Sequence, residues 1–160
     1  MDAATLRHGL GHFGSGITVV TGLTDTGPVG FTCQSFCSLS LNPALVTFAP
    51  ARTSTTWPLI RPLPTFGITI LAAHQSTHST AFSRQGTDKF AGVSWRRGDH
   101  GAPILDDALA TLECRVWAEY DGGDHTIVAA EVIALDVDER RAPLLYYRSA
   151  YAHVSHHIAI

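Results

Sequence analysis

The stretch Leu112–Tyr120 reads Leu-Glu-Cys-Arg-Val-Trp-Ala-Glu-Tyr and alternates strictly between two sets of side chains. Leu112, Cys114, Val116, Ala118 and Tyr120 form one set, and the residues between them are charged except for a tryptophan. Successive side chains of a β-strand point to opposite faces of a sheet, so this period of two predicts a half-buried strand.

The segments on both sides of this strand are also mostly β in pattern. We expect a hairpin whose arms meet at a turn over Thr24–Gly27, and short helices after Asp2, over Thr53–Arg61 and over His74–Arg84. The other expected strands are Ile17–Leu23, Val29–Phe31, Ala44–Ala49, Phe66–Ala72, Thr126–Val137 and Leu144–Tyr147, and Gly86–Gly92 is expected to be a loop leading towards Val93–Trp95. About seven strands with few helices between them predict a barrel or sandwich, and residues 1–160 are expected to form one domain because no linker divides them.

Composition limits the classes of partner. The 160 residues are 45% hydrophobic and 16% charged, with a net charge of -3, which favours an oligomer. The 11 basic residues are scattered, so nucleic-acid binding is not expected, and neither a membrane span nor a signal peptide is found. The odd number of cysteines predicts reduced thiols and a cytoplasmic protein. The histidine pairs His8/His12 and His74/His78 lack the glutamate of a His-Glu-x-x-His motif, so no metal site is expected.

The segment Gly30–Pro43 carries hydroxyl and amide groups between apolar residues and has no formal charge. An apolar wall with a few polar groups is typical of a site for a large, mostly neutral ligand. An ordinary Ser/Thr-rich surface loop fits the same composition equally well.

Three further segments are candidates for a site. Arg52–Thr56 offers a cation and four hydroxyls at an expected helix start, which suits a phosphate, although a simple capped helix has the same pattern. Lys89 and Phe90 lie in a Gly-flanked loop that is able to close over a ligand. His125 follows Gly122-Gly123-Asp124 where a turn passes into a strand, a position that directs a side chain towards the mouth of a cleft, although an ordinary turn without function has the same pattern.

Two common motifs are excluded. Residues 9–14 match Gly-x-Gly-x-x-Gly, but a dinucleotide fingerprint requires a preceding strand and a following helix, and here the order is reversed. A Gly-x-Ser-x-Gly nucleophile elbow does not occur in the sequence.

Together these segments closely resemble the short-chain flavin reductase family, whose members are split β-barrels with Greek-key topology and serve as reductase components of two-component flavin monooxygenases. The resemblance covers nearly the whole chain. It is carried by Leu6–Thr21, Gly30–Pro43, Asp88–Gly92, Gly123–His125 and Pro143–Arg148, which follow one another in family order.

The resemblance implies a role for each segment. The flavin ring would be held by Phe31, Thr32, Cys33, Gln34, Ser35 and Phe36, with Ser38 and Ser40 supporting the loop. Arg52, Thr53, Ser54, Thr55 and Thr56 would receive the flavin phosphate, and Lys89 and Phe90 would cover the flavin or the nicotinamide. His125 would lie beside the nicotinamide as the catalytic residue, acting in positioning, and Tyr147, Arg148 and Tyr151 would complete that side.

The implied activity is an NAD(P)H:flavin oxidoreductase that reduces FMN or FAD and supplies diffusible reduced flavin to a partner monooxygenase. A homodimer with flavin sites near the subunit contact is also implied. The alternatives are a split-barrel flavoprotein that retains its flavin and a non-enzymatic interaction module. The sequence leaves open FMN against FAD and NADH against NADPH. It assigns no role to the His-rich C-terminal end.

Three positions depart from the family pattern. Thr69 stands where Asn is common, and Ala130 and Ser149 stand where Gly is common. The added Cβ atoms restrict the backbone most at the two glycine positions.

Overall fold

The computed structural model describes residues 1–155, so residues 156–160 of the His-rich end lie outside the described residues. Its helices are short: α1 (Ala3–Leu10), α2 (Trp57–Ile60) and α3 (Ser76–Ser83). Its strands are β1 (Ser15–Gly16), β2 (Thr18–Thr24), β3 (Gly27–Cys33), β4 (Cys37–Leu41), β5 (Ala44–Phe48), β6 (Phe66–Ile70), β7 (Trp95–Arg97), β8 (Pro103–Leu105), β9 (Ala110–Gly122), β10 (His125–Val137), β11 (Leu145–Tyr147) and β12 (Ala150–Ala152). The predicted mainly β class is confirmed.

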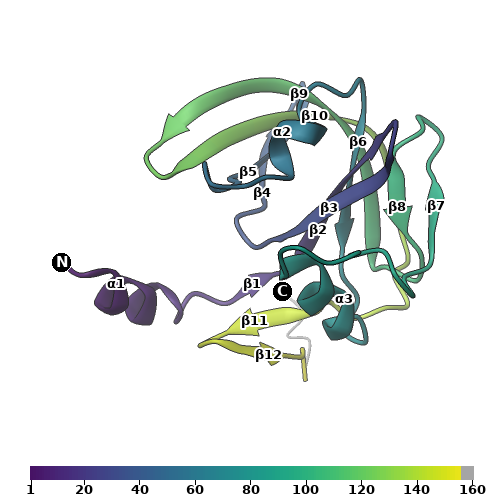
Figure 1. Ribbon diagram of the computed structural model, residues 1–160. Helices are drawn as coiled ribbons and strands as arrows, with labels where there is room; N and C mark the ends of the chain where they lie inside the picture. Colours follow the sequence, from purple (N-terminus) through teal and green to yellow (C-terminus); the bar gives the residue numbers. More distant parts are fainter. Residues whose placement is uncertain (156–160) are drawn as a thin grey trace.

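Seven of the strands form one antiparallel sheet in the order β3-β2-β6-β9-β10-β5-β4. β3 and β4 are the two edges of this sheet, yet only Gln34–Phe36 separate them in sequence. So short a link spans at most about 14 Å between Cys33 and Cys37, so the sheet must roll until its edges approach each other. Figure 1 shows this curvature, with β9 and β10 arching over β5 and α2. The result is a barrel that is split between β3 and β4, as predicted.

The core lies on both faces of β2, because alternate side chains of a strand point to opposite sides. Val20 packs inside the rolled sheet with Phe48, Trp57 and Phe66, whose rings meet edge to face. Val19 packs on the outer face, in a second cluster that includes residues of α3, β8 and the chain before β11. Burial on both sides explains why β2 is so rich in β-branched residues.

Three expectations need correction. Cys37–Leu41 was expected to continue a loop, but it is strand β4, an edge strand with mostly exposed side chains. The helix expected over Thr53–Arg61 is limited to α2, because the Ser54 hydroxyl accepts the N–H groups of Thr56 and Trp57 and forms a turn before it. Short strands β1, β7, β8 and β12 were not expected at all.

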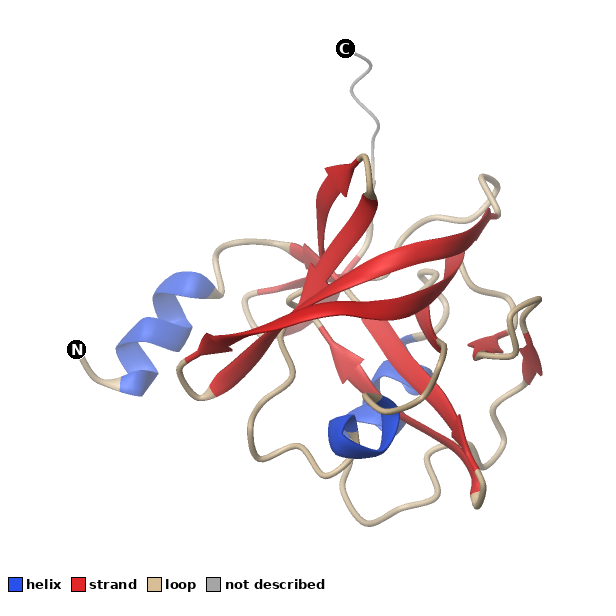
Figure 2. Cartoon of the chain, turned by 90° about the horizontal axis from the view of Figure 1, so that it is seen from above, coloured by secondary structure: helices blue, strands red, loops and turns tan. Residues whose placement is uncertain are grey.

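Helix α1 stands apart from the rest of the chain. Asp2 caps its first turn by accepting the backbone N–H groups of Ala4 and Thr5. None of its residues is buried, and Figure 2 shows it projecting away from the strands. No helix within residues 1–155 is long and apolar enough to cross a membrane.

Candidate functional site

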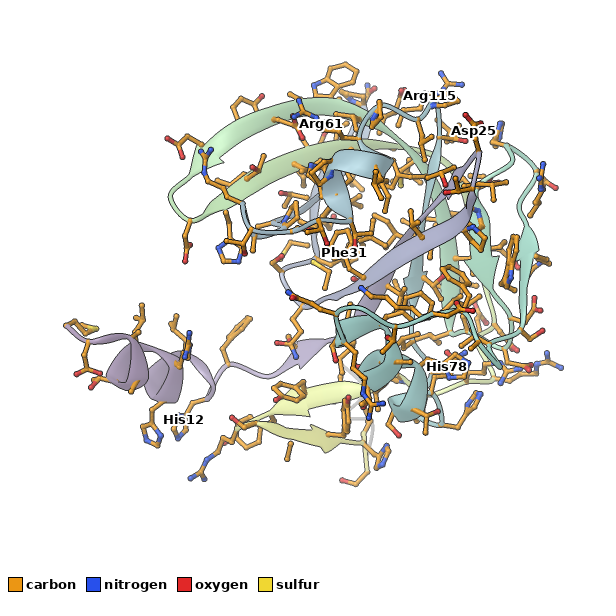
Figure 3. All side chains as sticks on the ribbon, in the orientation of Figure 1. His12, Asp25, Phe31, Arg61, His78 and Arg115 are labelled. Carbon is orange, nitrogen blue, oxygen red and sulfur yellow. The ribbon has the colours of Figure 1, made fainter. Side chains whose placement is uncertain are left out.

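A cleft of about 780 Å³ opens beside the β3 edge of the split barrel. Its walls come from β3 and the turn after it, from Ala49–Thr56, from the end of α3 with the loop that follows, and from His125. Figure 3 shows Phe31, one of the lining residues, in the centre of the molecule. Of the described residues that line the cleft, only Asp88 and Lys89 carry a formal charge at neutral pH. Its size and its mixed, nearly neutral lining suit a flat organic ligand.

The unpaired edge of β3 faces this cleft. Pro28 has no N–H to donate to β2, and the Gly30 carbonyl accepts a hydrogen bond from the Lys89 ammonium at 3.0 Å. The backbone groups of Pro28, Gly30 and every second residue of β3 therefore point away from β2. Thr32 belongs to the same set. The edge therefore presents backbone donors and acceptors to a ligand, and the Lys89 ammonium is bonded to one of the acceptors. Gly30 itself has no room for a side chain, because a Cβ there would lie 2.9 Å from the Phe82 ring.

The hydroxyls at the end of β3 have partners inside the protein. The Thr32 hydroxyl donates to the Ser79 carbonyl at 2.6 Å, which ties β3 to α3. The Ser35 hydroxyl accepts the Ala49 N–H at 2.8 Å and donates to the Ala49 carbonyl at 3.3 Å, which ties the β3–β4 turn to the end of β5. These two side chains therefore shape the cleft, and towards a ligand they can act only as acceptors.

Residues 53–56 line the cleft on the side of β5. The segment is anchored through Trp57, whose indole N–H donates to the Glu119 carboxylate at 2.8 Å. The other oxygen of Glu119 pairs with Arg61 at 2.7 Å. Strand β9 therefore holds both ends of α2 and fixes the hydroxyl-bearing segment before it.

His125 begins β10 and lines the cleft with a half-exposed side chain. Its Nδ1 lies 2.7 Å from the Asp124 Oδ1. Hydrogen bonding to this imidazole holds the pKa of the Asp124 carboxyl below its usual range. The turn before it needs Gly123, whose φ of +77° is rarely adopted by other residues. His125 thus lines the cleft, and its position at a cleft mouth remains a prediction.

The loop after α3 covers one side of the cleft. Phe90 packs edge to face against Phe82 and Trp95, with ring centroids 4.9 and 5.8 Å away. Burial lowers the pKa of the Lys89 ammonium, which the loop places against the edge of β3. The loop is therefore fastened at two points, one apolar and one polar.

The cleft brings together twelve of the residues predicted from the sequence: Phe31, Thr32, Cys33, Gln34, Ser35, Thr53, Ser54, Thr55, Thr56, Lys89, Phe90 and His125. The sequence did not single out the remaining walls, which include Pro28, Val29, Ala49, Pro50, Ala51, Phe82, Ser83, Gln85, Gly86 and Thr87. Several of these are apolar or small and directly adjoin a predicted segment, so proximity in sequence was the available signal.

Four predicted residues do not line the cleft because their side chains or strands face elsewhere. Phe36 packs against the barrel core. Ser38 and Ser40 lie on β4 beyond the turn. Arg52 directs its guanidinium to the β9–β10 turn, where it pairs with Asp121 at 2.7 Å.

Tyr147, Arg148 and Tyr151 lie on the β11–β12 hairpin, which is also not part of the cleft wall. The Tyr151 hydroxyl lies 3.0 Å from the Thr80 hydroxyl of α3, and the Arg148 N–H donates to the Gly11 carbonyl. The hairpin therefore connects α3 with the chain after α1. A role for these three residues beside the nicotinamide remains a prediction.

The three departures from the family pattern are accommodated locally. Thr69 is fully buried and accepts the Leu105 N–H. Ala130 is also fully buried, beside a β-bulge in the β9–β10 pairing. Ser149 has a φ of +64° in the β11–β12 turn, which is the conformation that glycine adopts more readily.

All three cysteines are free, as predicted. Within residues 1–155, no group of three or more His, Cys, Asp or Glu side chains has the arrangement of a metal site.

The sequence profile of the family described as "Flavin reductase like domain" matches residues 10–155. A curated relative is the reductase subunit HsaB of a flavin-dependent monooxygenase from Rhodococcus jostii, which is 40% identical over 151 residues, 94% of this chain and 77% of the relative. FMN reductase (NADH) SmoA from Agrobacterium fabrum is 41% identical over 132 residues, 82% of this chain and 75% of the relative.

Solved structures agree in fold. A nitrilotriacetate monooxygenase component B homologue from Mycobacterium thermoresistibile superposes with a TM-score of 0.93 at 40% identity, over 98% of this chain and 90% of that one. The NADH:FAD oxidoreductase SgcE6 of Streptomyces globisporus, solved with NAD and FAD fragments, gives 0.92 at 35% identity, over 96% and 93%. With a matching profile over most of its length and relatives above 30% identity, the chain belongs to the flavin reductase-like domain family.

Proposed function

We propose that this protein is an NADH:flavin oxidoreductase that reduces FMN or FAD and releases the reduced flavin to a partner monooxygenase. The observation that carries this proposal is the nearly uncharged cleft along the β3 edge, which His125 also lines. Its relatives named as reductase subunits or components of flavin-dependent monooxygenases support the same function.

The residues of the cleft fit a flavin. The β3 edge offers backbone hydrogen-bonding groups for the polar edge of the ring, and Phe31 and Phe90 offer apolar contact. The hydroxyls of Thr53, Thr55 and Thr56 would hold the phosphate. When bound, the flavin supplies the redox chemistry, since its N5 accepts a hydride from C4 of the nicotinamide.

The protein's own contribution is to bind and orient. The Lys89–Gly30 contact and the packing of Phe90 hold the covering loop against the cleft, which limits the freedom of a ring inside it. His125 would position the nicotinamide from the opposite wall. Hydride transfer needs no general base from the protein, so the imidazole has no proton to remove.

NADH oxidation with added FMN, FAD and riboflavin tests the function directly. We expect His125→Ala to slow reduction by NADH in stopped-flow measurements at least tenfold, as expected for a lost positioning contact, and to change flavin affinity less than twofold. Equal loss of both would refute the role assigned to His125.

Flavin retention distinguishes the alternative of a bound prosthetic group. A colourless protein that reduces added flavin supports a diffusible product. A yellow protein that fails to oxidise NADH would support a flavin-storing protein or another substrate.

We also propose a homodimer that pairs over α1. Leu6, Leu10 and Phe13 lie on or just after this helix and are 48%, 65% and 82% exposed, an apolar surface that a second copy would cover. We further propose that residues 1–160 form one domain and that the protein is cytoplasmic, which its free cysteines support.

A further inference from the structure

Arg52 makes three hydrogen bonds to the β9–β10 turn, by which we mean Asp121–Asp124, the last two residues of β9 and the two that follow. Its Nε donates to the Gly123 carbonyl at 2.7 Å, and an Nη donates to the Asp121 carboxylate at 2.7 Å. Its backbone N–H donates to the Asp124 carbonyl at 2.8 Å. One residue therefore binds three positions of the turn that leads directly into His125.

Neighbouring contacts join the same two segments. Ala51 forms an isolated β-bridge with His125, and the Thr126 N–H donates to the Pro50 carbonyl at 3.0 Å. The Asp121 carboxylate that pairs with Arg52 also accepts the Gly123 N–H at 3.0 Å. Through these bonds, the segment Pro50–Arg52 sets the position of the turn that precedes His125.

This geometry differs from that of a phosphate ligand. Both bonded sides of the Arg52 guanidinium face the turn, its charge is balanced by Asp121, and it does not line the cleft. The Arg52 guanidinium is also the largest influence that holds the pKa of Asp121 below its usual range. The pair is exposed, and exposed ion pairs contribute little to stability, so variants at either position are expected to fold.

We propose that Arg52 is a positioning residue that holds the β9–β10 turn through its hydrogen bonds and so fixes the direction in which His125 enters the cleft. This proposal rests on the proposed function, in which His125 contacts the nicotinamide. Arg52→Ala removes the two side-chain bonds, to Asp121 and Gly123, and so loosens the start of the turn that leads into His125, while the backbone bonds at Asp124 and Thr126 remain. A misplacement of about 1 Å in an active site can cost up to about a hundredfold in rate.

The test compares Arg52→Ala, Asp121→Ala and the double variant with FMN and with riboflavin, which lacks the phosphate. We expect each single variant to lower kcat/KM for NADH about tenfold or more, equally with both flavins. The double variant should be no worse than the single ones, and flavin affinity should change less than twofold. Arg140→Ala is the matched control, because this exposed arginine pairs with Asp138 away from the cleft.

A loss with FMN but not with riboflavin would show that Arg52 binds the phosphate, and unchanged NADH kinetics would show that it positions nothing; either result overturns the proposal. A wild-type protein that oxidises no NADH refutes the proposed function instead. In that case the positioning of His125 by Arg52 is tested through the NMR signals of the His125 ring, with the signals of the His78 ring as control. The His125 signals should shift or broaden in Arg52→Ala, and unchanged His125 signals would overturn the proposal.

Discussion

The buried carboxylate of Glu113 stabilises the β7–β8 hairpin, and its removal gives a measurable prediction. Glu113 lies on β9 and is 4% exposed. Its Oε1 accepts the N–H groups of His100 and Ala102 at 3.0 Å, and its Oε2 accepts that of His100 at 3.0 Å. The loop closes tightly around the carboxylate, because a Cβ at Gly98 would overlap it.

The two variants at this position are expected to differ. A hydrogen bond to a charged group contributes about 1.5 to 3 kcal/mol, so Glu113→Ala, which leaves two backbone donors without this acceptor, should lower the free energy of unfolding by about 3 to 5 kcal/mol. Glu113→Gln keeps an oxygen that can take the place of Oε1 for both donors. This variant loses the charge, and its amide NH₂ group faces the His100 N–H in place of Oε2. It should lower the free energy of unfolding by about 1 to 2 kcal/mol.

Urea unfolding at pH 7, followed by tryptophan fluorescence, measures these differences. All variants are compared at one protein concentration, because pairing of chains would make stability depend on it. Glu139→Ala is the control: this exposed residue follows β10, and its loss should change stability by less than about 0.5 kcal/mol. A cost below about 1 kcal/mol for Glu113→Ala, or equal costs for the two Glu113 variants, would refute the reasoning.

Two further predictions concern the thiols and the exposed helix. Burial, and then the charge of Glu113, raise the pKa of the Cys114 thiol to about 12, so this group stays protonated in the folded protein at pH 8. A thiol reagent at that pH should modify exposed Cys37 at once and Cys114 only in urea; rapid labelling of folded Cys114 would contradict this. Light scattering should give twice the 17.2 kDa mass of the chain for the wild type and a monomer for Leu10→Asp, with Asp25→Ala as the unaffected control. A dimer that survives Leu10→Asp would place the interface elsewhere.

The sequence predicted the strands whose pattern is a direct consequence of burial. The strict alternation of Leu112–Tyr120 lies within β9, and the apolar run Thr126–Val137 lies within β10. The expected burial of one face does not hold at the two ends of the alternating stretch, because Glu113 is buried and Tyr120 is 58% exposed. Strand β4 was missed although Leu39 and Leu41 alternate with serines, because all but one of its side chains are exposed and no burial pattern separates its faces. Strands of two or three residues, such as β1, have too few positions for any period.

Arg52 shows the limit of prediction for the site. A cation followed by hydroxyls indicates a phosphate site from local sequence alone, and the hydroxyls do line the cleft. The partner of the guanidinium, Asp121, is 69 residues away, and the alternation of β9 does not show which residues its tip will meet. Local pattern therefore located the segment, and long-range topology determined the orientation of its first side chain.

The same topology explains why the cleft lies at the first part of the uncharged segment Gly30–Pro43, where Gly30–Ser35 line it and β4 does not. This segment supplies the end of one sheet edge, the turn, and the whole of the other edge, so it borders the split on both sides. An unpaired edge exposes backbone N–H and C=O groups that otherwise invite pairing with another strand. Here Lys89 takes one of these groups, the Gly30 carbonyl, and the covering loop shields the edge from other chains. A ligand that enters the cleft completes hydrogen bonds that the incomplete barrel leaves open, and this requires a neutral, hydrogen-bonding edge such as that of a flavin ring rather than a charged group.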